Sequence, residues 1–260
     1  QLQAAHPHVR FQVRTVATGG DIHPNEPIDR LGIGAFVKEL EVALLRREID
    51  VAVHSLKDVP ASQPRDMTIA AVTRREDPCD ALVDRWNLPL DELPGGARIG
   101  TGSPRRAAQL RHLRPDLEVL PIRGNVGTRV AKARSRAYDG VVLAAAGLHR
   151  LGLHKEIAAY IAPDICIPEP GQGALAVETR AGDARIQGLA ASVDHGPTRT
   201  AVAAEVEVLR ALGGGCKTPI AAYAELRGDM LFLRGMVADA EGRRVIRATA
   251  EGPADQPEQV

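Results

Sequence analysis

Aromatic side chains and cysteines are scarce in this 260-residue chain, and both shortages narrow its possible functions. Phe, Tyr and Trp make up 3% of the residues, which leaves few platforms on which nucleic-acid bases could stack. The three cysteines, Cys79, Cys166 and Cys216, include no CxxC pair, and an odd number argues against a disulfide framework. We therefore expect a reducing, cytoplasmic environment.

The chain also lacks net charge and long apolar runs. Lys and Arg number 33, as do Asp and Glu, so bulk attraction to nucleic acid or anionic lipid is not implied. The longest apolar runs fall well short of the roughly 20 residues that cross a bilayer, and no signal-peptide pattern is seen at the start. We expect neither nucleic acid nor membrane as a partner. The polar start at Gln1 and the tail to Val260 predict a chain trimmed at both ends.

Strand and helix patterns alternate along most of the chain, which predicts doubly wound α/β sheets with parallel strands. The predicted strands are residues 9–16, 49–54, 67–72, 98–100, 117–122 and 141–146, and the predicted helices are residues 35–48, 105–113 and 128–138. Residues 18–34 are rich in Gly, Pro, Asp and Asn and predict a long loop. From residue 198 onward a helix pattern precedes three strands at 220–226, 231–237 and 244–249, which predicts a small α+β unit.

Basic residues are concentrated between Arg98 and Arg136, where ten Lys and Arg side chains face only Asp116 and Glu118. Helix N-termini gather anions, and the planar guanidinium group grips carboxylate or phosphate at two points. Four of the arginines lie beside glycine turns or helix starts: Arg105, Arg106, Arg123 and Arg129. A solvated basic face, a phosphate site and a polycarboxylate site all remain open. The segment contains no aromatic residue, which disfavours nucleic acid, and the turn at 101–105 lacks the ending of a P-loop.

Asp58 lies in the segment His54–Pro60, at the end of a predicted strand. Ligands of open α/β sheets bind beyond the carboxyl ends of strands. Asp58 could be a general acid/base or the counter-ion of a developing cation. Spacing alone favours the simpler role of a carboxylate that caps a turn, and we interpret His54 as structural.

Cys216 follows three glycines and precedes Lys217. Backbone N–H groups and a nearby cation both favour the thiolate, which is the nucleophilic form. A lone cysteine in such a turn is usually inert, so both interpretations stay open. The acidic neighbours of Cys79 disfavour its thiolate, and Cys166 lies in an apolar run that predicts a core position.

Seven short motifs occur in one order along nearly the whole chain. They are Phe36–Glu41, His54–Pro60, Gly100–Arg106, Arg123–Arg129, Ala146–Gly152, Pro170–Ala174 and Gly214–Ile220. Together they resemble the porphobilinogen deaminase (hydroxymethylbilane synthase) family. Gly19 and Ile33 depart from its pattern, because many members carry a basic residue at these places.

The resemblance implies three domains. The first would be a split α/β domain of residues 1–75 and 174–193 that carries the catalytic aspartate. The second would be an arginine-rich α/β domain of residues 76–173, and these two would share the topology of two-domain solute-binding proteins. The third would be a truncated α+β domain of residues 194–260 with the cofactor cysteine.

The resemblance also implies a transferase of porphyrin, haem or chlorophyll synthesis, acting as a cytoplasmic monomer without a metal. It would deaminate four porphobilinogen molecules and join them head to tail into the linear tetrapyrrole hydroxymethylbilane. The primer would be a dipyrromethane cofactor bound to Cys216 by a thioether. Asp58 matches the catalytic aspartate, and Phe36 would pack against a pyrrole ring. The carboxylates of substrate and cofactor would bind Lys57, Thr101, Ser103, Arg105, Arg106, Arg123, Arg129 and Arg150.

The main alternative is a non-enzymatic protein that binds a small anion on the same two-domain scaffold. It would explain the arginines and the glycine turns, but it gives no role to Asp58 or to Cys216. A nucleic-acid-binding module is a more distant alternative, and it predicts binding that weakens steeply with salt.

Overall fold

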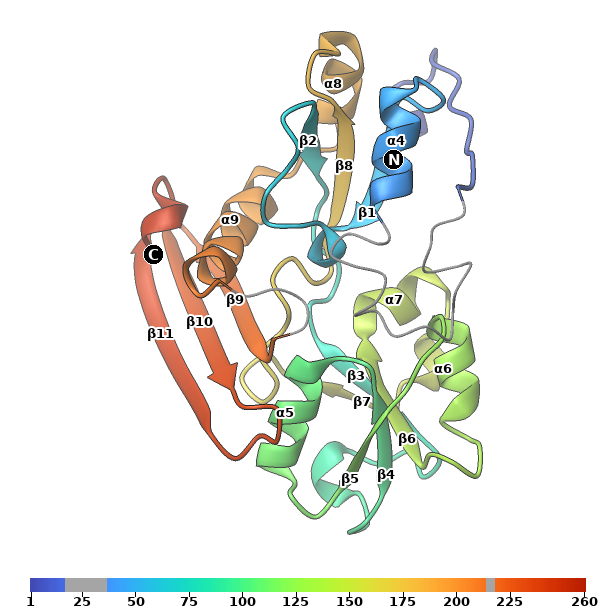
Figure 1. Cartoon of the computed structure of the whole chain (residues 1–260), viewed down its shortest axis with the longest axis vertical. Coiled ribbons are helices and arrows are strands. Elements are labelled where there is room, and N and C mark those ends of the chain that lie inside the picture. The colour runs from blue at the N-terminus through green and yellow to red at the C-terminus, as the bar shows by residue number, and fades with distance from the viewer. Residues whose placement is uncertain (17–36, 214–217) are drawn as a thin grey trace. The chain divides into compact units, whose positions relative to one another are not determined.

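A computed structural model describes residues 1–16, 37–213 and 218–260 (Figure 1). The chain divides into two compact units, one of residues 1–75 with 174–200 and one of residues 76–173 with 201–260. The helices are α1 (Leu2–Ala5), α4 (Lys38–Leu45), α5 (Pro104–Leu113), α6 (Val126–Lys132), α7 (Ala145–Arg150), α8 (Ala184–Ala191) and α9 (Gly196–Ala211). Short 3-10 helices are η1 (Leu56–Asp58), η2 (Leu90–Glu92), η3 (His154–Glu156) and η4 (Pro257–Gln259). The strands are β1 (Ala52–Ser55), β2 (Met67–Val72), β3 (Asp80–Asp84), β4 (Arg98–Thr101), β5 (Glu118–Pro121), β6 (Gly140–Ala144), β7 (Ala159–Ile161), β8 (Leu175–Arg180), β9 (Ile220–Arg227), β10 (Met230–Ala238) and β11 (Val245–Pro253).

The sheet of the first unit has β8 at its centre, in the order β1-β8-β2. Both neighbours run antiparallel to β8. Leu44 of α4 packs with apolar residues of β1 and β2, and Ala190 of α8 packs with residues of β2 and β8. The central strand follows β2 only after the whole stretch 76–173, so two separate segments of the chain build this unit.

The second unit contains a five-stranded sheet in the order β5-β4-β6-β3-β7. Strand β4 is parallel to β5 and β6, whereas β3 is antiparallel to β6 and β7. The predicted α/β fold is confirmed, but the prediction of parallel sheets is wrong for the first unit, whose described strands pair antiparallel with β8. Parallel pairing among the described strands is confined to β4 with β5 and β4 with β6. Parallel neighbours need a crossover connection, which α5 and α6 provide between β4, β5 and β6.

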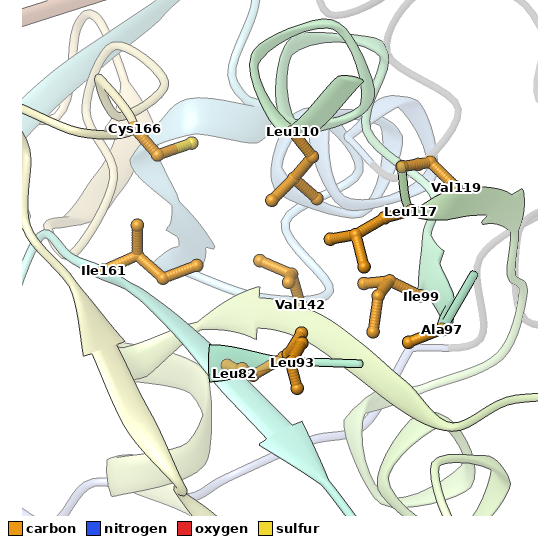
Figure 2. Close-up of a cluster of buried hydrophobic side chains, with 10 residues drawn as sticks. All are labelled: Leu82, Leu93, Ala97, Ile99, Leu110, Leu117, Val119, Val142, Ile161 and Cys166. Carbon is orange, nitrogen blue, oxygen red and sulfur yellow. The ribbon is translucent and has the colours of Figure 1, made fainter. Parts of the chain in front are cut away.

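Helices cover both faces of this sheet. On one face, Leu82, Ile99 and Val142 pack with Leu110 of α5, as Figure 2 shows. On the other face, residues of β3 and β6 pack with Val130 of α6 and Leu148 of α7. Burial on both faces explains why β3 and β6 carry apolar residues in succession rather than in alternation.

The α+β segment predicted from residue 198 onward is confirmed as α9 followed by an antiparallel meander, β9-β10-β11. Ala201 and Ala204 of α9 pack on Ala222 and Leu231 of the sheet. The turn between β10 and β11 lies against α5, where Nη1 of Arg111 donates to the carbonyl oxygen of Ala240 at 2.7 Å. A Cβ at Gly242, whose φ is +70°, would collide with the carbonyl oxygen of Ala108. Glycine is therefore required for this close approach.

The strand predicted over residues 9–16 is wrong, because the structure assigns these residues to no strand. Alternating apolar and polar residues favour a strand only where the apolar side chains are buried and a partner strand is present. Val13 is instead 94% exposed. The predicted loop at 18–34 lies outside the described residues. Among the described residues, no helix is both long and apolar enough to span a membrane.

Candidate functional site

The loop after β1 carries Lys57 and Asp58. Strand β1 passes directly into η1, and the backbone N–H of Leu56 donates to the carbonyl oxygen of Ala174 at 3.0 Å. Leu56 is buried, Lys57 is half-buried and Asp58 is exposed. The buried leucine anchors the turn, so the predicted place of Asp58 at a strand end is confirmed. Its catalytic role stays a prediction.

A buried polar pair lies just before this loop. Nε2 of His54 on β1 is 2.8 Å from Oε2 of Glu178 on β8, and the two side chains are 4% and 0% exposed. Oε1 of Glu178 has no hydrogen-bond partner within the described structure. Burial, and then the charge of Glu178, raise the pKa of Glu41 on α4. The pair joins two neighbouring strands inside the core, which agrees with a structural role for His54.

We expect Glu178→Ala to lower the free energy of unfolding by about 3 kcal/mol, because it leaves the buried imidazole of His54 without its partner. Urea denaturation measures this loss. Glu178→Gln keeps the shape and an acceptor oxygen, so it is the matched control and should lose less. Equal losses for the two variants would contradict this role of the carboxylate.

Thr101 and Ser103 shape the turn between β4 and α5. Oγ1 of Thr101 accepts the backbone N–H of Ser103 at 3.3 Å, and Oγ of Ser103 accepts the backbone N–H of Arg106 at 3.4 Å. Ser103 is thus the N-cap of α5, and Pro104 occupies a position in the first turn that suits its fixed φ. The cap fixes the start of α5 and places Arg105 and Arg106 in its first turn.

Arg105 and Arg106 are both buried, and both bind Asp80, the first residue of β3. Nη2 of Arg105 lies 2.8 Å from Oδ2 of Asp80, and Nε of Arg106 lies 2.9 Å from Oδ1. Nε2 of Gln172 donates to the same Oδ1 at 2.8 Å. Burial raises the pKa of Asp80, but the two arginines outweigh it and hold that pKa well below its usual range. The sequence alone pointed to no role for Asp80, nor for Gln172, which lies in the motif Pro170–Ala174.

The turn between β5 and α6 lies next to the turn between β4 and α5. Oδ1 of Asn125 caps α6, and Nε of Arg129 donates to the carbonyl oxygen of Gly124 at 2.6 Å. A Cβ at Gly102 would lie 2.9 Å from the carbonyl oxygen of Ile122 and 3.7 Å from Nη1 of Arg129. Glycine at position 102 therefore lets the two turns approach each other closely.

The structure brings six of the predicted binding residues to the carboxyl ends of the parallel strands β4 and β5, all in the second unit. They are Thr101, Ser103, Arg105, Arg106, Arg123 and Arg129. Arg150 ends α7, and its Nη2 donates to the carbonyl oxygen of Gly173 at 2.6 Å. Lys57 and Asp58 belong to the first unit. This arrangement offers several cations to an anion in one unit and an exposed carboxylate in the other.

Cys216 and Phe36 lie outside the described residues, so their predicted roles remain predictions. Burial is the first cause that raises the pKa of Cys79 to about 12, and Asp77 adds to it. Cys166 is fully buried, which confirms its predicted core position. Within the described ranges, no group of three or more His, Cys, Asp and Glu side chains could hold a metal ion.

Comparisons with known proteins cover almost the entire chain. The family model "Porphobilinogen deaminase, dipyromethane cofactor binding domain" matches residues 1–188, and "Porphobilinogen deaminase, C-terminal domain" matches residues 199–260. A porphobilinogen deaminase of Roseiflexus castenholzii is 48% identical over 98% of this chain and 84% of its own length. One from Stenotrophomonas maltophilia is 48% identical over 99% of this chain and 86% of its own length. Among solved structures, the methionine binding protein MetQ covers 60% of this chain and 74% of its own at 13% identity, with a TM-score of 0.42.

Proposed function

Because the chain belongs to the porphobilinogen deaminase family, we propose that it is a hydroxymethylbilane synthase. It joins four porphobilinogen molecules head to tail and releases one ammonia with each addition. The observation that carries this proposal is the group of basic side chains at the ends of β4 and β5, within the segment that matches the cofactor-binding family model.

The charge of the substrate explains the arginines. Each porphobilinogen carries an acetate and a propionate, so a growing chain accumulates carboxylates. Guanidinium groups bind carboxylates through charge-assisted hydrogen bonds at two points. The residues that supply this charge and the accompanying donors at the ligand are Lys57, Thr101, Ser103, Arg106, Arg123, Arg129 and Arg150. Arg105, which the sequence also predicted to bind these carboxylates, is buried and binds Asp80 instead.

The same residues fit a dipyrromethane cofactor, because that group is itself a polycarboxylate. When bound, it supplies the pyrrole carbon to which the first substrate is joined. We assign its thioether to Cys216 and a ring contact to Phe36. Cys79 and Cys166 are poor candidates, because burial raises the pKa of both thiols to about 12.

Asp58 supplies the chemistry at the substrate. The bond between the aminomethyl carbon and nitrogen breaks, ammonia leaves and a cationic azafulvene remains. The carboxylate of Asp58, beside the pyrrole N–H, stabilises that cation. After the new carbon–carbon bond forms, Asp58 accepts the proton that the ring loses as it becomes aromatic again.

The domain boundaries, the oligomeric state and the cellular compartment are also part of this proposal. We assign residues 1–75 with 174–193, 76–173 and 194–260 to three domains, with Asp58 in the first and Cys216 in the third. We propose that the protein works as a monomer in the cytoplasm. Its neutral net charge and scarce aromatics support a small-molecule substrate over nucleic acid.

The proposal is tested by incubating the purified protein with porphobilinogen and measuring ammonia release. Its intact mass, recorded under denaturing conditions, should exceed the sequence mass by two pyrrole rings, and an acidic aldehyde reagent should detect a dipyrrole. Substrate incubated without protein is the control. Binding of porphobilinogen without ammonia release, at the bare sequence mass, would favour the anion-binding alternative.

A further inference from the structure

Asp80, to which the proposed reaction gives no role, occupies the centre of a buried charged cluster. Its side chain is 0% exposed, and the side chains of Arg105 and Arg106 are 2% and 5% exposed. Such a carboxylate must be compensated, because an isolated buried charge is very unfavourable. Asp80 lies on β3, whereas both arginines lie in the first turn of α5, so the cluster ties that turn to the sheet.

Both terminal nitrogens of Arg105 bind groups inside the protein. Its Nη2 binds Asp80, and its Nη1 donates to the carbonyl oxygen of Ile167 at 2.6 Å. Nε is buried and has no hydrogen-bond partner within the described structure. The neighbouring acids Asp80 and Glu169 raise the pKa of Arg105 against the effect of burial, so this guanidinium group stays charged. Arg105 therefore fastens α5 to β3 and to the segment around Ile167.

Arg106 is held along one edge only. Its Nε and Nη2 both contact Oδ1 of Asp80, and Nη2 also donates to Oε1 of Gln172 at 3.1 Å. Nη1 makes no hydrogen bond within the described structure, and it is not fully buried. The guanidinium group is thus fixed on one side by Asp80 and Gln172 and has one nitrogen left to donate.

We propose that Asp80 and Gln172 are positioning residues: they orient Arg106 so that its Nη1 meets a carboxylate of the cofactor or substrate, while Arg105 fastens α5 and contacts no ligand. This inference rests on the proposed function and divides the work between two adjacent arginines. A guanidinium group whose orientation is already fixed loses less conformational freedom when it binds a carboxylate.

Two explanations of the cluster predict opposite effects of Asp80→Asn on carboxylate binding. If the cluster only supplied positive charge, then Asp80→Asn would leave two arginines without their acid and would strengthen carboxylate binding. If Asp80 orients Arg106, then the same change weakens binding, because the Nε and Nη2 edge loses its charged acceptor. The direction of the change therefore separates the two explanations.

The experiment compares Asp80→Asn, Gln172→Leu, Arg106→Gln and the double variant Asp80→Asn/Arg106→Gln. The readouts are the fraction of chains that carry the dipyrrole adduct, by intact mass, and the KM for porphobilinogen. Asp84→Asn is the matched control. Asp84 is a buried aspartate at the other end of β3, and its Oδ1 accepts the backbone N–H of Trp86 at 2.7 Å. Urea midpoints show how much stability each variant loses.

We expect Asp80→Asn to raise KM about tenfold and to lower the adduct fraction, and Gln172→Leu to do so less strongly. Asp84→Asn should change neither readout, even if it lowers the urea midpoint. In the Arg106→Gln background, Asp80→Asn should have little further effect, because the two residues act as one unit. Tighter binding in Asp80→Asn, or fully additive effects in the double variant, would overturn the proposal. If Asp80→Asn does not fold, an unchanged KM in Gln172→Leu would overturn it instead. Absence of adduct and ammonia release in the unmodified protein would instead refute the proposed function.

Discussion

Asp58→Asn should lower kcat by roughly two to three orders of magnitude, since the stabilisation of charge by one oriented group is typically of this size. The amide has nearly the shape of the carboxylate but neither its negative charge nor its ability to accept the proton. The dipyrrole adduct should remain, because the substitution does not alter Cys216, to which the thioether is assigned. Single-turnover measurements of ammonia release, together with intact mass, separate the two effects.

Asp66→Asn is the matched control for this experiment. Asp66 is an exposed aspartate in the same connection between β1 and β2, just before β2 begins. Its substitution should leave kcat unchanged. A wild-type rate in Asp58→Asn, or an equal loss in the two variants, would refute the assigned role of Asp58.

Cys216→Ser should abolish both the adduct and turnover. A serine hydroxyl stays protonated at neutral pH, and only a sulfur atom can form the thioether, so the variant should have the bare sequence mass. Because every addition depends on the attached primer, ammonia release should fall to the rate of substrate alone. Intact mass and the acidic aldehyde reagent check the first expectation, and an ammonia assay checks the second.

Cys79→Ser provides the control for the loss of a thiol. Cys79 is half-buried, and its high pKa keeps it protonated at neutral pH. This variant should keep the adduct and the full rate. An adduct that persists in Cys216→Ser, or one that disappears in Cys79→Ser, would show that the cofactor is attached elsewhere.

Local signals predicted the turns of the candidate site well. The helix predicted over residues 105–113 corresponds to α5, whereas the helix predicted over 128–138 begins and ends earlier, at Val126 and Lys132. Both helices start after a side-chain cap, Ser103 or Asn125, which acts on a backbone N–H group only three residues away. The strand at Met67–Val72 and the meander after α9 were also predicted, since their apolar patterns lie within single elements. These features need no knowledge of distant partners.

The residues that sequence reasoning missed have partners far along the chain. Asp80 meets Arg105 and Gln172, and Glu178 meets His54, each across different elements of the fold. Nothing within a few residues of Asp80 distinguishes it from a carboxylate at the edge of a loop. Only the pairing of strands and the placement of α5 show that it is buried, so such clusters follow from tertiary structure.

The central position of β8 has a consequence for biosynthesis. A ribosome releases β1 and β2 long before β8, yet in the finished sheet both pair with β8 and not with each other. Until then their edges are open to other chains, which is a known route to aggregation. The strands and helices of residues 76–173 emerge as an uninterrupted block during this interval. We therefore expect the middle of the polypeptide to acquire structure before its beginning does, and nascent chains that stall ahead of residue 175 to require a chaperone.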